Sequence, residues 1–504
     1  MSPMEIKDVG DLAFSQGTNR YFLHCSAHQP NDYWPGSYGG EGLKFNRNNP
    51  WFTMSRGFMD NIARTQFLLQ RGAFYADVLN FAGTSVPTDI DLDKSLSTPV
   101  GYRDLSVNSD ALIKFADVKD GRIVLPTGTS FAVMTLPAGD GMDIESLKKI
   151  EELVSKGATI VGQKPVREKT LKNYPACDAE IKKLADRIWQ NCDGTRVKKV
   201  KYGKGNVYWN VPMQEILSDL HILPDFEYKV DSDKRLMVFN HRTDVASGSE
   251  IYFVSNCENS AVKAVLTFGK PRKYCEIWHT EFGEIFPCKY ELLKDGRAQV
   301  ALELSPKESL LVVFRDEQSR NYSPSANLDR HALTEIKTIG GTWNISFACT
   351  PVNMKPPKPF TSDHLFRLDE SDNDELKYFS GYITYENEFV FDKKSLSAAS
   401  RVVLDLGEVN MLADLYLNGK KVASLWRPPF ACDVTENLKD GKNTIKVVVV
   451  NHLDNRIIGD LKLPKEQRVV KLTIDNVLTG YRFRNEKPMP SGLVGPVTLE
   501  LGRR

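Results

Sequence analysis

Residues 413–419, ADLYLNG, and residues 443–451, NTIKVVVVN, decide the fold of the last part of the chain. Both are short runs dominated by aliphatic and β-branched residues, which is typical of strands. The Asn418-Gly419 dipeptide favours a tight hairpin turn. Working outward, further strand-like runs are YITYENEFVF, RVVLDLG and PVTLELG. We therefore predict that residues 360–504 form a jelly-roll β-sandwich.

Residues 226–350 contain short alternating strands separated by turn residues. The strand-like runs are RLMVFNHRT, EIYFVSN, AVKAVLTFG, CEIWHTEFGEI, AQVALEL and SLLVVF. Such a series predicts an antiparallel β-sandwich or meander. GTWNISF at residues 341–347 is expected to be a connecting strand, and KPPKPF at residues 355–360 is expected to be a linker.

Residues 76–225 alternate strands with helices. The apparent strands are YADVLNF, DALIKFA, FAVMTLP and ATIVG, and DIESLKKIEELVSKG at residues 143–157 has the pattern of a helix. Asp143 is a suitable N-cap for this helix, and Gly157 is placed to end it. The alternation predicts a doubly wound α/β domain of the flavodoxin-like or amidotransferase-like kind.

Residues 1–75 have the pattern helix, strand, loop, helix. The predicted strand is TNRYFLHCSA at residues 18–27, and the second helix covers residues 50–70. A parallel strand that is apolar on both sides needs neighbours at both edges and helices on both faces. Either the next domain covers this unit, or the rest of its sheet lies upstream in a longer ancestral chain. We expect this segment to be the least stable part of the molecule.

Composition sets limits on function. At roughly 100–200 residues per domain, 504 residues correspond to three or four domains. The 66 basic and 65 acidic residues give a net charge of +1, which favours a neutral ligand over nucleic acid or an anionic membrane. The eight cysteines include no CxxC pair, which favours buried free thiols over a zinc site or a disulfide framework. The terminus MSPMEIKDVGD lacks signal-peptide features, and no stretch is long and apolar enough to span a bilayer, so the chain as written is predicted to be cytoplasmic.

The sequence FLHCSAHQP places His24 and His28 at the carboxyl end of the predicted strand, where ligands sit in parallel sheets. Gln29 and Trp34 follow, so the segment offers hydrogen-bonding groups together with a flat aromatic face, and a sugar needs both. From the spacing alone, histidines that are satisfied in the core or in a loop are the more common case. Metal binding is weaker still, because no carboxylate cluster accompanies them.

A second candidate is KFNRNNPWF, in which Asn46 and Arg47 are suited to line a polar pocket. The alternative is a loop that closes onto a helix N-terminus, with Asn48 or Asn49 as the cap and Pro50 in the first turn. Both interpretations stay open, and they are compatible with each other.

Two further stretches carry weaker signals. Trp426 lies in the apolar turn LWRPPF, where packing in a sandwich corner is the favoured interpretation. In NHLDNRIIGD, at residues 451–460, structural hydrogen bonding and ligand contact cannot be separated by pattern. The sequence contains no GxGxxG, P-loop or GxSxG motif.

Several long stretches occur together: KDVGDLAFSQGTNRYFLHCSAHQP, FNRNNPWF, ARTQFLLQRG, EIYFVSN, KYFSGYITY, LYLNGKKVASLWRPPF and NRIIGD. In these stretches the chain resembles the carboxy-terminal half of the α-L-rhamnosidase-like glycoside hydrolases, family 106, over essentially its whole length. The resemblance implies a multidomain α/β plus all-β fold. Residues 1–75 would be the end of a (β/α)8-type catalytic barrel, followed by an amidotransferase-like domain (76–225), a β-sandwich (226–350) and a galactose-binding-like jelly roll (360–504).

The resemblance also implies a reaction. Relatives hydrolyse terminal α-L-rhamnosyl linkages of plant or microbial polysaccharides with inversion, using two carboxylates and a bound calcium ion. One catalytic glutamate of these relatives lies shortly before the stretch that matches residues 2–10, and the other lies further upstream. We therefore expect the catalytic carboxylates upstream of Met1, and a truncated chain that is inactive alone, although intact relatives are often exported to the periplasm or cell surface.

The same resemblance bears on the acids and polar residues near the amino terminus. Glu5, Asp8 and Asp11 do not match the family's acids, so no catalytic residue is assigned within the chain. The expected substrate-binding residues are His24, His28, Gln29, Trp34, Asn46 and Arg47.

Two alternatives from other classes remain. One is a non-catalytic carbohydrate-binding or scaffold protein built on the β-sandwich domains, and the other is a gene product without function. An adjoining reading frame that encodes the barrel would favour the enzyme.

Overall fold

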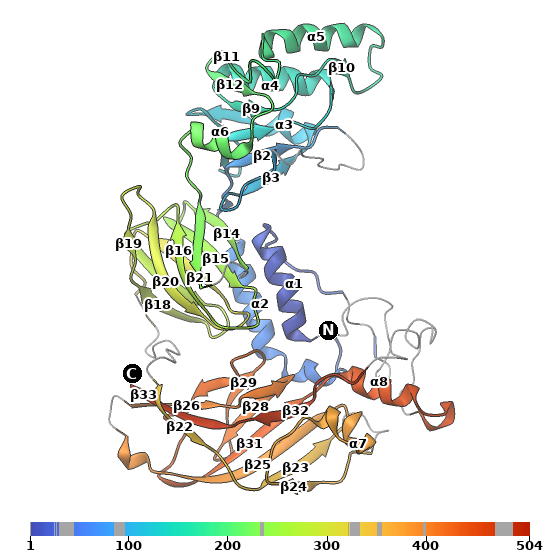
Figure 1. Ribbon diagram of the computed structural model, residues 1–504, viewed down its shortest axis with the longest axis vertical. Coiled ribbons are helices and arrows are strands. Elements are labelled where there is room, and N and C mark those ends of the chain that lie inside the picture. Colours follow the sequence, from blue (N-terminus) through green and yellow to red (C-terminus); the bar gives the residue numbers. More distant parts are fainter. Residues whose placement is uncertain are drawn as a thin grey trace.

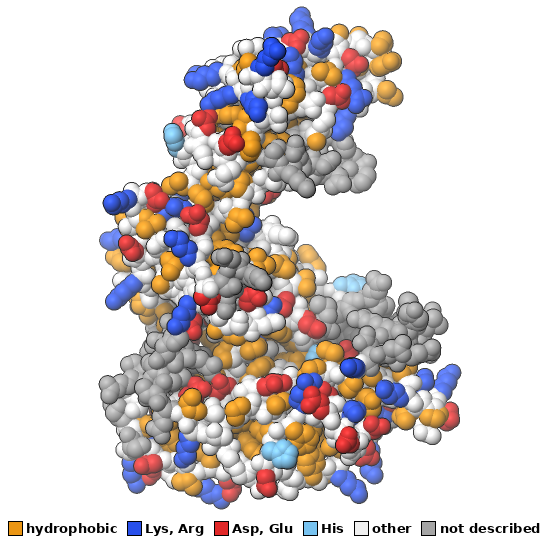
Figure 2. Space-filling model, in the orientation of Figure 1, with side chains coloured by type: hydrophobic (Ala, Val, Ile, Leu, Met, Phe, Trp, Pro, Cys, Tyr) orange, Lys and Arg blue, Asp and Glu red, His pale blue; other side chains and the backbone are white. Residues whose placement is uncertain are grey.

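The computed structural model describes residues 2–24, 26, 28–29, 45–84, 96–231, 236–320, 322, 333–349, 355–396, 400–468 and 487–503. The chain is multidomain and mostly β, with some helices (Figure 1). A parallel-sheet domain lies at one end, a β-sandwich in the middle and a jelly roll at the other end. Basic and acidic side chains are interspersed over the face shown in Figure 2, in agreement with the net charge of +1. Within the described residues, no helix is long and apolar enough to cross a membrane.

The parallel-sheet domain is built on six strands in the order β11-β12-β9-β7-β2-β3. The pairs from β12 to β3 are parallel, and β11 is an antiparallel edge. Apolar residues of α3, α4 and α5 cover one face of the sheet, and those of α6 cover the other. The alternation of strands and helices in the sequence thus gives a sheet with helices on both faces. One predicted strand, DALIKFA at residues 110–116, is wrong, because this segment forms helix α3 behind an Asn108 N-cap.

The elements of this domain are β2 (Val78–Phe81), β3 (Asp104–Val107), α3 (Ser109–Phe115), β4 (Asp117–Lys119), β5 (Arg122–Val124), β6 (Ser130–Phe131), β7 (Val133–Thr135), β8 (Gly141–Met142), α4 (Ile144–Lys156), β9 (Thr159–Val161), β10 (Arg167–Glu168), α5 (Ala176–Trp189), β11 (Lys199–Tyr202), β12 (Gly205–Tyr208) and α6 (Met213–Asp219).

Helix α4 follows the prediction closely. The Asp143 side chain accepts a hydrogen bond from the backbone N–H of Ser146 at 2.9 Å, and Gly157 ends the helix with a φ of 131°. Its buried residues recur at helical spacing and face the sheet: Ile144, Ser146, Leu147, Ile150, Leu153 and Val154.

The β-sandwich has two antiparallel sheets in the orders β1-β14-β15-β21-β17-β18 and β13-β16-β20-β19. All eight residues of β15 are buried, because one of its faces lines the sandwich core and the other is covered by α1 (Pro3–Ser15) and α2 (Arg56–Leu69). The strands are β1 (Ala73–Phe74), β13 (Phe226–Val230), β14 (Met237–Asp244), β15 (Ser249–Asn256), β16 (Val262–Phe268), β17 (Tyr274–His279), β18 (Glu284–Cys288), β19 (Glu291–Leu292), β20 (Ala298–Leu304) and β21 (Ser309–Arg315).

The jelly roll has sheets in the orders β24-β23-β25-β31-β28-β29 and β22-β33-β26-β30, with a small β27-β32 pair. Asn418 and Gly419 both have positive φ, at 52° and 80°, and join β28 to β29 as the predicted hairpin turn.

The elements of the jelly roll are β22 (Leu333–Thr338), β23 (Trp343–Ala348), β24 (Phe360–Ser362), η4 (Leu368–Glu370), α7 (Asp374–Lys377), β25 (Tyr382–Phe391), η5 (Lys393–Ser395), β26 (Ser400–Asp405), β27 (Glu408–Asn410), β28 (Leu412–Leu417), β29 (Lys420–Leu425), β30 (Ala431–Asp433), β31 (Gly441–Val450), α8 (Leu453–Leu461), η6 (Lys465–Gln467), β32 (Gly492–Gly495) and β33 (Thr498–Arg503).

Strand pairing corrects the predicted boundary at residues 350–360. Strand β22 pairs with β33, and β23 lies between β24 and β25, so both strands belong to the jelly roll. KPPKPF therefore joins two strands of one sheet and is not a linker between domains. The prediction failed because the alternating pattern of residues 341–347 fits either sandwich, and strand pairing is not a local property.

The described part of residues 1–75 contains helices α1 and α2, the 3-10 helix η1 and the short strand β1, and α1 and α2 lie between the sandwich and the jelly roll (Figure 1). Helix α1 (Pro3–Ser15) begins at a capping box between Ser2 and Glu5, and α2 (Arg56–Leu69) follows the 3-10 helix η1 (Pro50–Met54). The predicted parallel strand at residues 18–27 is wrong for the part of that segment that the structure describes, which has no regular secondary structure and pairs with no sheet. Apolar residues of the sandwich and of the jelly roll pack against the two helices. Both alternatives for the rest of the sheet stay predictions.

Helix α8 was not anticipated in a region expected to be all-β. Leu453, Ile457 and Ile458 are buried on one side of it, at the spacing that an amphipathic helix requires. The signal was present in the sequence but is only nine residues long.

Candidate functional site

Three of the predicted sugar-contacting residues come together in one polar node. The Arg47 guanidinium donates to the backbone oxygen of Gln29 at 2.9 Å, and the Asn48 side-chain amide donates to Gln29 Oε1 at 3.0 Å. Asn46 Oδ1 accepts from the backbone N–H of Asn48 at 2.9 Å. Gln29, Asn46 and Asn48 are buried, whereas Arg47 is exposed. The node therefore holds amide and guanidinium groups beside the surface, and such groups suit sugar hydroxyls.

The histidines are placed differently. His24 and His28 are both exposed, and neither belongs to the hydrogen bonds that form the node. Trp34 lies outside the described residues. Their assignment as substrate-binding residues stays a prediction.

The expected position of the catalytic carboxylates, upstream of Met1, also stays a prediction. Met1 itself lies outside the described residues, and the description of the amino-terminal segment begins at Ser2, the N-cap of α1. The acids of α1, the first helix that the structure describes, are Glu5, Asp8 and Asp11.

The helix-start interpretation of KFNRNNPWF also holds. Asn49 occupies the N-cap position of η1 with Pro50 in its first turn, although the Asn49 side chain makes no capping hydrogen bond. The node and the helix start are therefore adjacent features of one loop, and the role of Asn46 and Arg47 in a ligand pocket stays a prediction.

The node rests on an apolar cluster shared with the jelly roll. The Phe45 ring meets Trp51 edge-to-face at 5.4 Å, and the Phe58 ring meets Trp426 at 5.4 Å. Tyr382 of β25 donates to the backbone oxygen of Pro50 at 3.0 Å. Trp426 is thus a core residue, as the sequence favoured.

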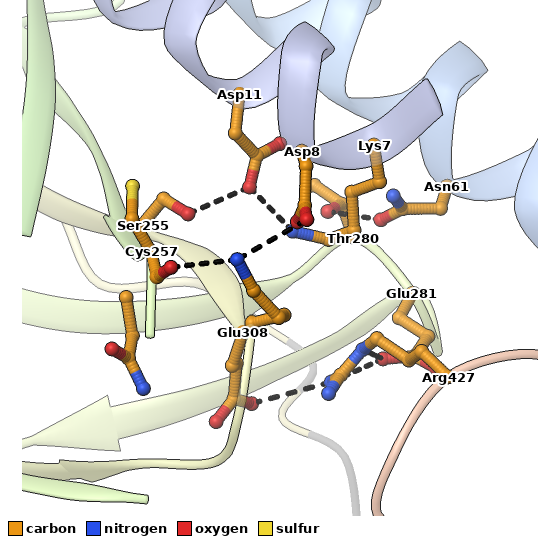
Figure 3. Close-up of polar contacts among 12 residues, drawn as sticks. Lys7, Asp8, Asp11, Asn61, Ser255, Cys257, Thr280, Glu281, Glu308 and Arg427 are labelled. Carbon is orange, nitrogen blue, oxygen red and sulfur yellow. Dashed lines mark hydrogen bonds and ion pairs between the residues drawn. The ribbon is translucent and has the colours of Figure 1, made fainter. Parts of the chain in front are cut away.

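A second polar group, which we call the interdomain junction, ties α1 and α2 to the sandwich and the jelly roll (Figure 3). Its residues are Lys7, Asp8, Asp11, Asn61, Ser255, Thr280, Glu281, Lys307, Glu308 and Arg427.

In the junction, the carboxylates of α1 have structural partners. Asp11 pairs with Lys7 and accepts from Ser255 Oγ at 2.6 Å, and Asp8 lies 3.1 Å from the Lys307 ammonium (Figure 3). Glu5 completes the capping box of α1. Each of these three acids therefore has a structural partner, and Asp8 and Asp11 tie α1 to the sandwich.

Arg427 is the centre of the other half of the junction. Its Nε donates to Glu281 Oε2 at 2.6 Å, and its Nη2 lies 3.7 Å from Glu308 (Figure 3). Burial raises the pKa of Glu281, and the neighbouring guanidinium opposes that rise. Arg64 of α2 donates to the backbone oxygens of Thr280 and Glu281, so one hairpin turn contacts both α2 and the jelly roll.

A separate buried cluster surrounds His241 of β14. Its Nδ1 lies 2.9 Å from Asp225 and its Nε2 lies 3.1 Å from Glu250. Burial alone would lower the pKa of His241, but the two carboxylates outweigh burial and raise it. The Tyr252 ring stacks on the imidazole at 3.8 Å, and Tyr252 donates to Asp225.

Neither the junction nor the His241 cluster was predicted from the sequence. A usable signal existed for Arg427, because an arginine inside the apolar run LWRPPF must either be exposed or find a buried acid. No comparable local signal marked its partners, which lie about 120–150 residues away in the sequence. Asn451 and Asn455, left undecided by the sequence, bond to backbone groups at residues 379, 381 and 489 and are structural. Among the described residues, no group of three or more His, Cys, Asp or Glu is placed to hold a metal ion.

Comparison with known proteins gives the family. The model of the α-L-rhamnosidase family, glycoside hydrolase family 106, matches residues 1–292, which is more than half of the chain. The chain belongs to this family. A galactose-binding-like domain model of glycoside hydrolase family 2 matches residues 361–471, which confirms the galactose-binding-like character of the jelly roll.

One solved structure is similar in fold, and one further relative is similar in sequence. The solved rhamnosidase of Novosphingobium sp. PP1Y matches 99% of this chain with a TM-score of 0.84 and 29% identity, over 46% of its own length. A protein of Formosa agariphila named "Putative beta-glucuronidase" is 26% identical over 99% of this chain and 61% of its own length. The chain thus spans less than two thirds of either protein.

Proposed function

We propose that this chain acts in the inverting hydrolysis of terminal α-L-rhamnosyl linkages in plant or microbial glycans. The observation that carries the proposal is the match of 99% of the chain to a solved rhamnosidase with a TM-score of 0.84, within a family whose model covers residues 1–292. The even charge balance supports a neutral sugar as ligand and gives no reason to propose a nucleic acid or a membrane as partner.

Within this function, the polar node is proposed to contact the sugar. Gln29, Asn46 and Arg47 support this role because hydrogen bonds already orient their side chains: Arg47 donates to the Gln29 backbone, and Asn48 bonds to the side chains of Gln29 and Asn46. Little freedom is therefore lost when a hydroxyl binds. His24, His28 and Trp34 are proposed to contact the same sugar as the polar node.

The proton-transferring carboxylates are proposed to lie apart from α1, upstream of Met1. An inverting glycosidase needs two carboxyl groups roughly 6.5–9.5 Å apart with a water between them. Asp8 and Asp11 are instead held by lysines, and Glu5 is held by the capping box, which supports this proposal.

The finer domain assignments are part of the proposal. Residues 1–75 would be the end of a (β/α)8-type barrel, and residues 76–225 an amidotransferase-like domain, which the parallel order of the sheet supports. A calcium ion bound by oxygen ligands is proposed from the family.

A binding experiment tests the sugar assignment. We expect calorimetry with methyl α-L-rhamnoside to show saturable binding at about millimolar dissociation constant, or roughly −4 kcal/mol. Gln29→Ala and Arg47→Ala should weaken it, whereas Gln70→Ala, an exposed glutamine after α2, should not. Saturable binding of a β-D-glucuronide but not of the rhamnoside would refute the assignment.

A turnover experiment tests the division of roles. Release of the aglycone from an aryl α-L-rhamnoside by the 504-residue chain is expected to stay at background. Enzymatic turnover that disappears in Glu5→Gln or Asp8→Asn, with the fold retained, would show that α1 supplies a catalytic acid.

A second function is favoured by the match of residues 361–471 to a galactose-binding-like domain. In this alternative the jelly roll binds carbohydrate without catalysis, as part of a binding or scaffold protein. Titration of the chain with rhamnose-bearing oligosaccharides separates the two, because binding that survives Gln29→Ala and Arg47→Ala would lie outside the node.

A further inference from the structure

Two cysteines face each other across one hairpin of the sandwich. Cys275 in β17 and Cys288 in β18 are register partners in an antiparallel pair. Both side chains contact the same apolar core of the sandwich, so they lie on the same side of the sheet. Both are free thiols, and among the described cysteines no other two are strand-register partners.

This placement meets the geometric requirements of a disulfide. Residues directly opposite in antiparallel strands have Cα atoms about 4.5–5.5 Å apart, and disulfides span about 4.4–6.8 Å. The register therefore places the two cysteines within bonding range, whichever type of opposed pair they form. Only side-chain rotation and a small approach of the two Cβ atoms are needed.

The two thiols also differ in access and reactivity. Cys275 is buried, whereas Cys288 lies on the edge strand of its sheet and is half-buried. The neighbouring Cys275 thiol lowers the pKa of Cys288, with burial opposing it. Cys288 is thus the thiol that a reagent in solution meets first.

We propose that Cys275 and Cys288 form a dithiol–disulfide site that closes the β17–β18 hairpin in an oxidising environment. The oxidant is a low-molecular-weight disulfide such as oxidised glutathione. The Cys288 thiolate attacks one sulfur of the oxidant, which gives a mixed disulfide and releases one thiol. Cys275 then attacks Cys288 Sγ, and its proton leaves with the second thiol. Two protein thiols are oxidised and one disulfide is reduced to two thiols, so electrons and protons balance.

The consequence lies at the tip of the hairpin. Residues 275–288 enclose Thr280 and Glu281, which contact α2 and Arg427 in the interdomain junction. A disulfide at the base of the hairpin restricts this loop in the unfolded chain and fixes it in the folded one. The oxidation state of the pair therefore sets how firmly the sandwich holds the other domains.

The test uses the complete 504-residue chain, incubated with reduced or oxidised glutathione and then alkylated without further reduction. Trypsin releases both cysteines in one peptide, residues 274–289, YCEIWHTEFGEIFPCK. After oxidation this peptide should be lighter by two hydrogen atoms and carry no alkyl group. Cleavage after its glutamates should leave its terminal fragments joined. Alkylation of both cysteines after oxidation, or a lasting glutathione adduct on Cys288, would overturn the proposal.

A stability measurement gives a second, independent readout. Oxidation should raise the melting temperature of the sandwich by about 5 °C or more, because the closed loop is about 15 residues long. Cys288→Ser should abolish this rise, and Cys192→Ser, a buried cysteine of the parallel-sheet domain, should leave it unchanged. An equal rise in Cys288→Ser would assign the effect to another thiol and refute the pair.

Discussion

Replacing Arg427 with methionine is expected to weaken the packing of the jelly roll against the sandwich. Its side chain is only 5% exposed and that of Glu281 only 14%, so the pair is held away from water. Removal of one partner of a buried ion pair costs about 3–5 kcal/mol, because the other charge stays buried and unpaired. Methionine keeps most of the side-chain volume, so the loss of stability measures the effect of removing the charge.

The loss of stability in Arg427→Met should depend on pH. Burial already raises the pKa of Glu281 above its usual range, and removing the guanidinium raises it further. A carboxyl group whose folded pKa exceeds its unfolded pKa is penalised when it must ionise in the folded state. The destabilisation is therefore full at neutral pH and shrinks as the pH falls and Glu281 takes up a proton.

Differential scanning calorimetry of the whole chain measures both effects. A loss of about 3 kcal/mol corresponds to a decrease of roughly 6–12 °C in the transition of these domains. Lys442→Met is the matched control, because its ion pair with Glu388 is 66% and 59% exposed and contributes about 0–1 kcal/mol. A shift for Arg427→Met no larger than the control, or the same at about pH 5 and pH 7, would refute the reasoning.

Three further predictions rest on other parts of the fold. Because its folded pKa is raised, His241 contributes stability below its usual pKa of about 6.5 that is lost as pH rises through the folded value. His241→Gln should remove this dependence from melting curves recorded across that range. Gly205→Ala should cost about 1–3 kcal/mol in urea unfolding, because the new Cβ would meet backbone carbonyl oxygens, whereas Gly340→Ala meets open space and should cost little. A fragment of residues 333–504 should elute as a monomer in size-exclusion chromatography. A fragment of residues 360–504 lacks strands β22 and β23 and should aggregate. A monomeric shorter fragment would show that these two strands are dispensable.

Elements with a local cause were predictable from the sequence. Helix α4 carries its own N-cap and glycine stop, and the Asn418-Gly419 turn has the positive φ values that this dipeptide favours. Elements that depend on distant partners were not. Residues 18–27 have the composition of a strand, but no sheet edge pairs with the described part of them, and their Tyr21 ring stacks on Phe14 of α1 instead.

The residues of the candidate site also divide into those that the sequence could predict and those that it could not. Gln29, Asn46 and Arg47 were identified because the polar and aromatic composition of their segments is unusual, and the structure brings them together through their own hydrogen bonds. Glu281 could not be paired with Arg427 from sequence, because nothing in a single chain specifies which buried acid meets which buried base across 146 residues. His241 shows the same limit, since its need for two carboxylates appears only when β14 and β15 are paired.

The placement of α1 and α2 has a consequence for how the protein is made. Phe58 packs on Trp426, and Thr53 contacts Tyr382, so α2 reaches its final surroundings only after the jelly roll has been synthesised. At about 5–20 residues per second, the ribosome needs roughly 20–80 s to go from the end of α2 to the end of β31. During that interval the apolar sides of α1 and α2 are not yet covered by the jelly roll. A segment that is synthesised early thus finishes folding late, and ribosome-associated chaperones should bind α1 and α2 during that interval.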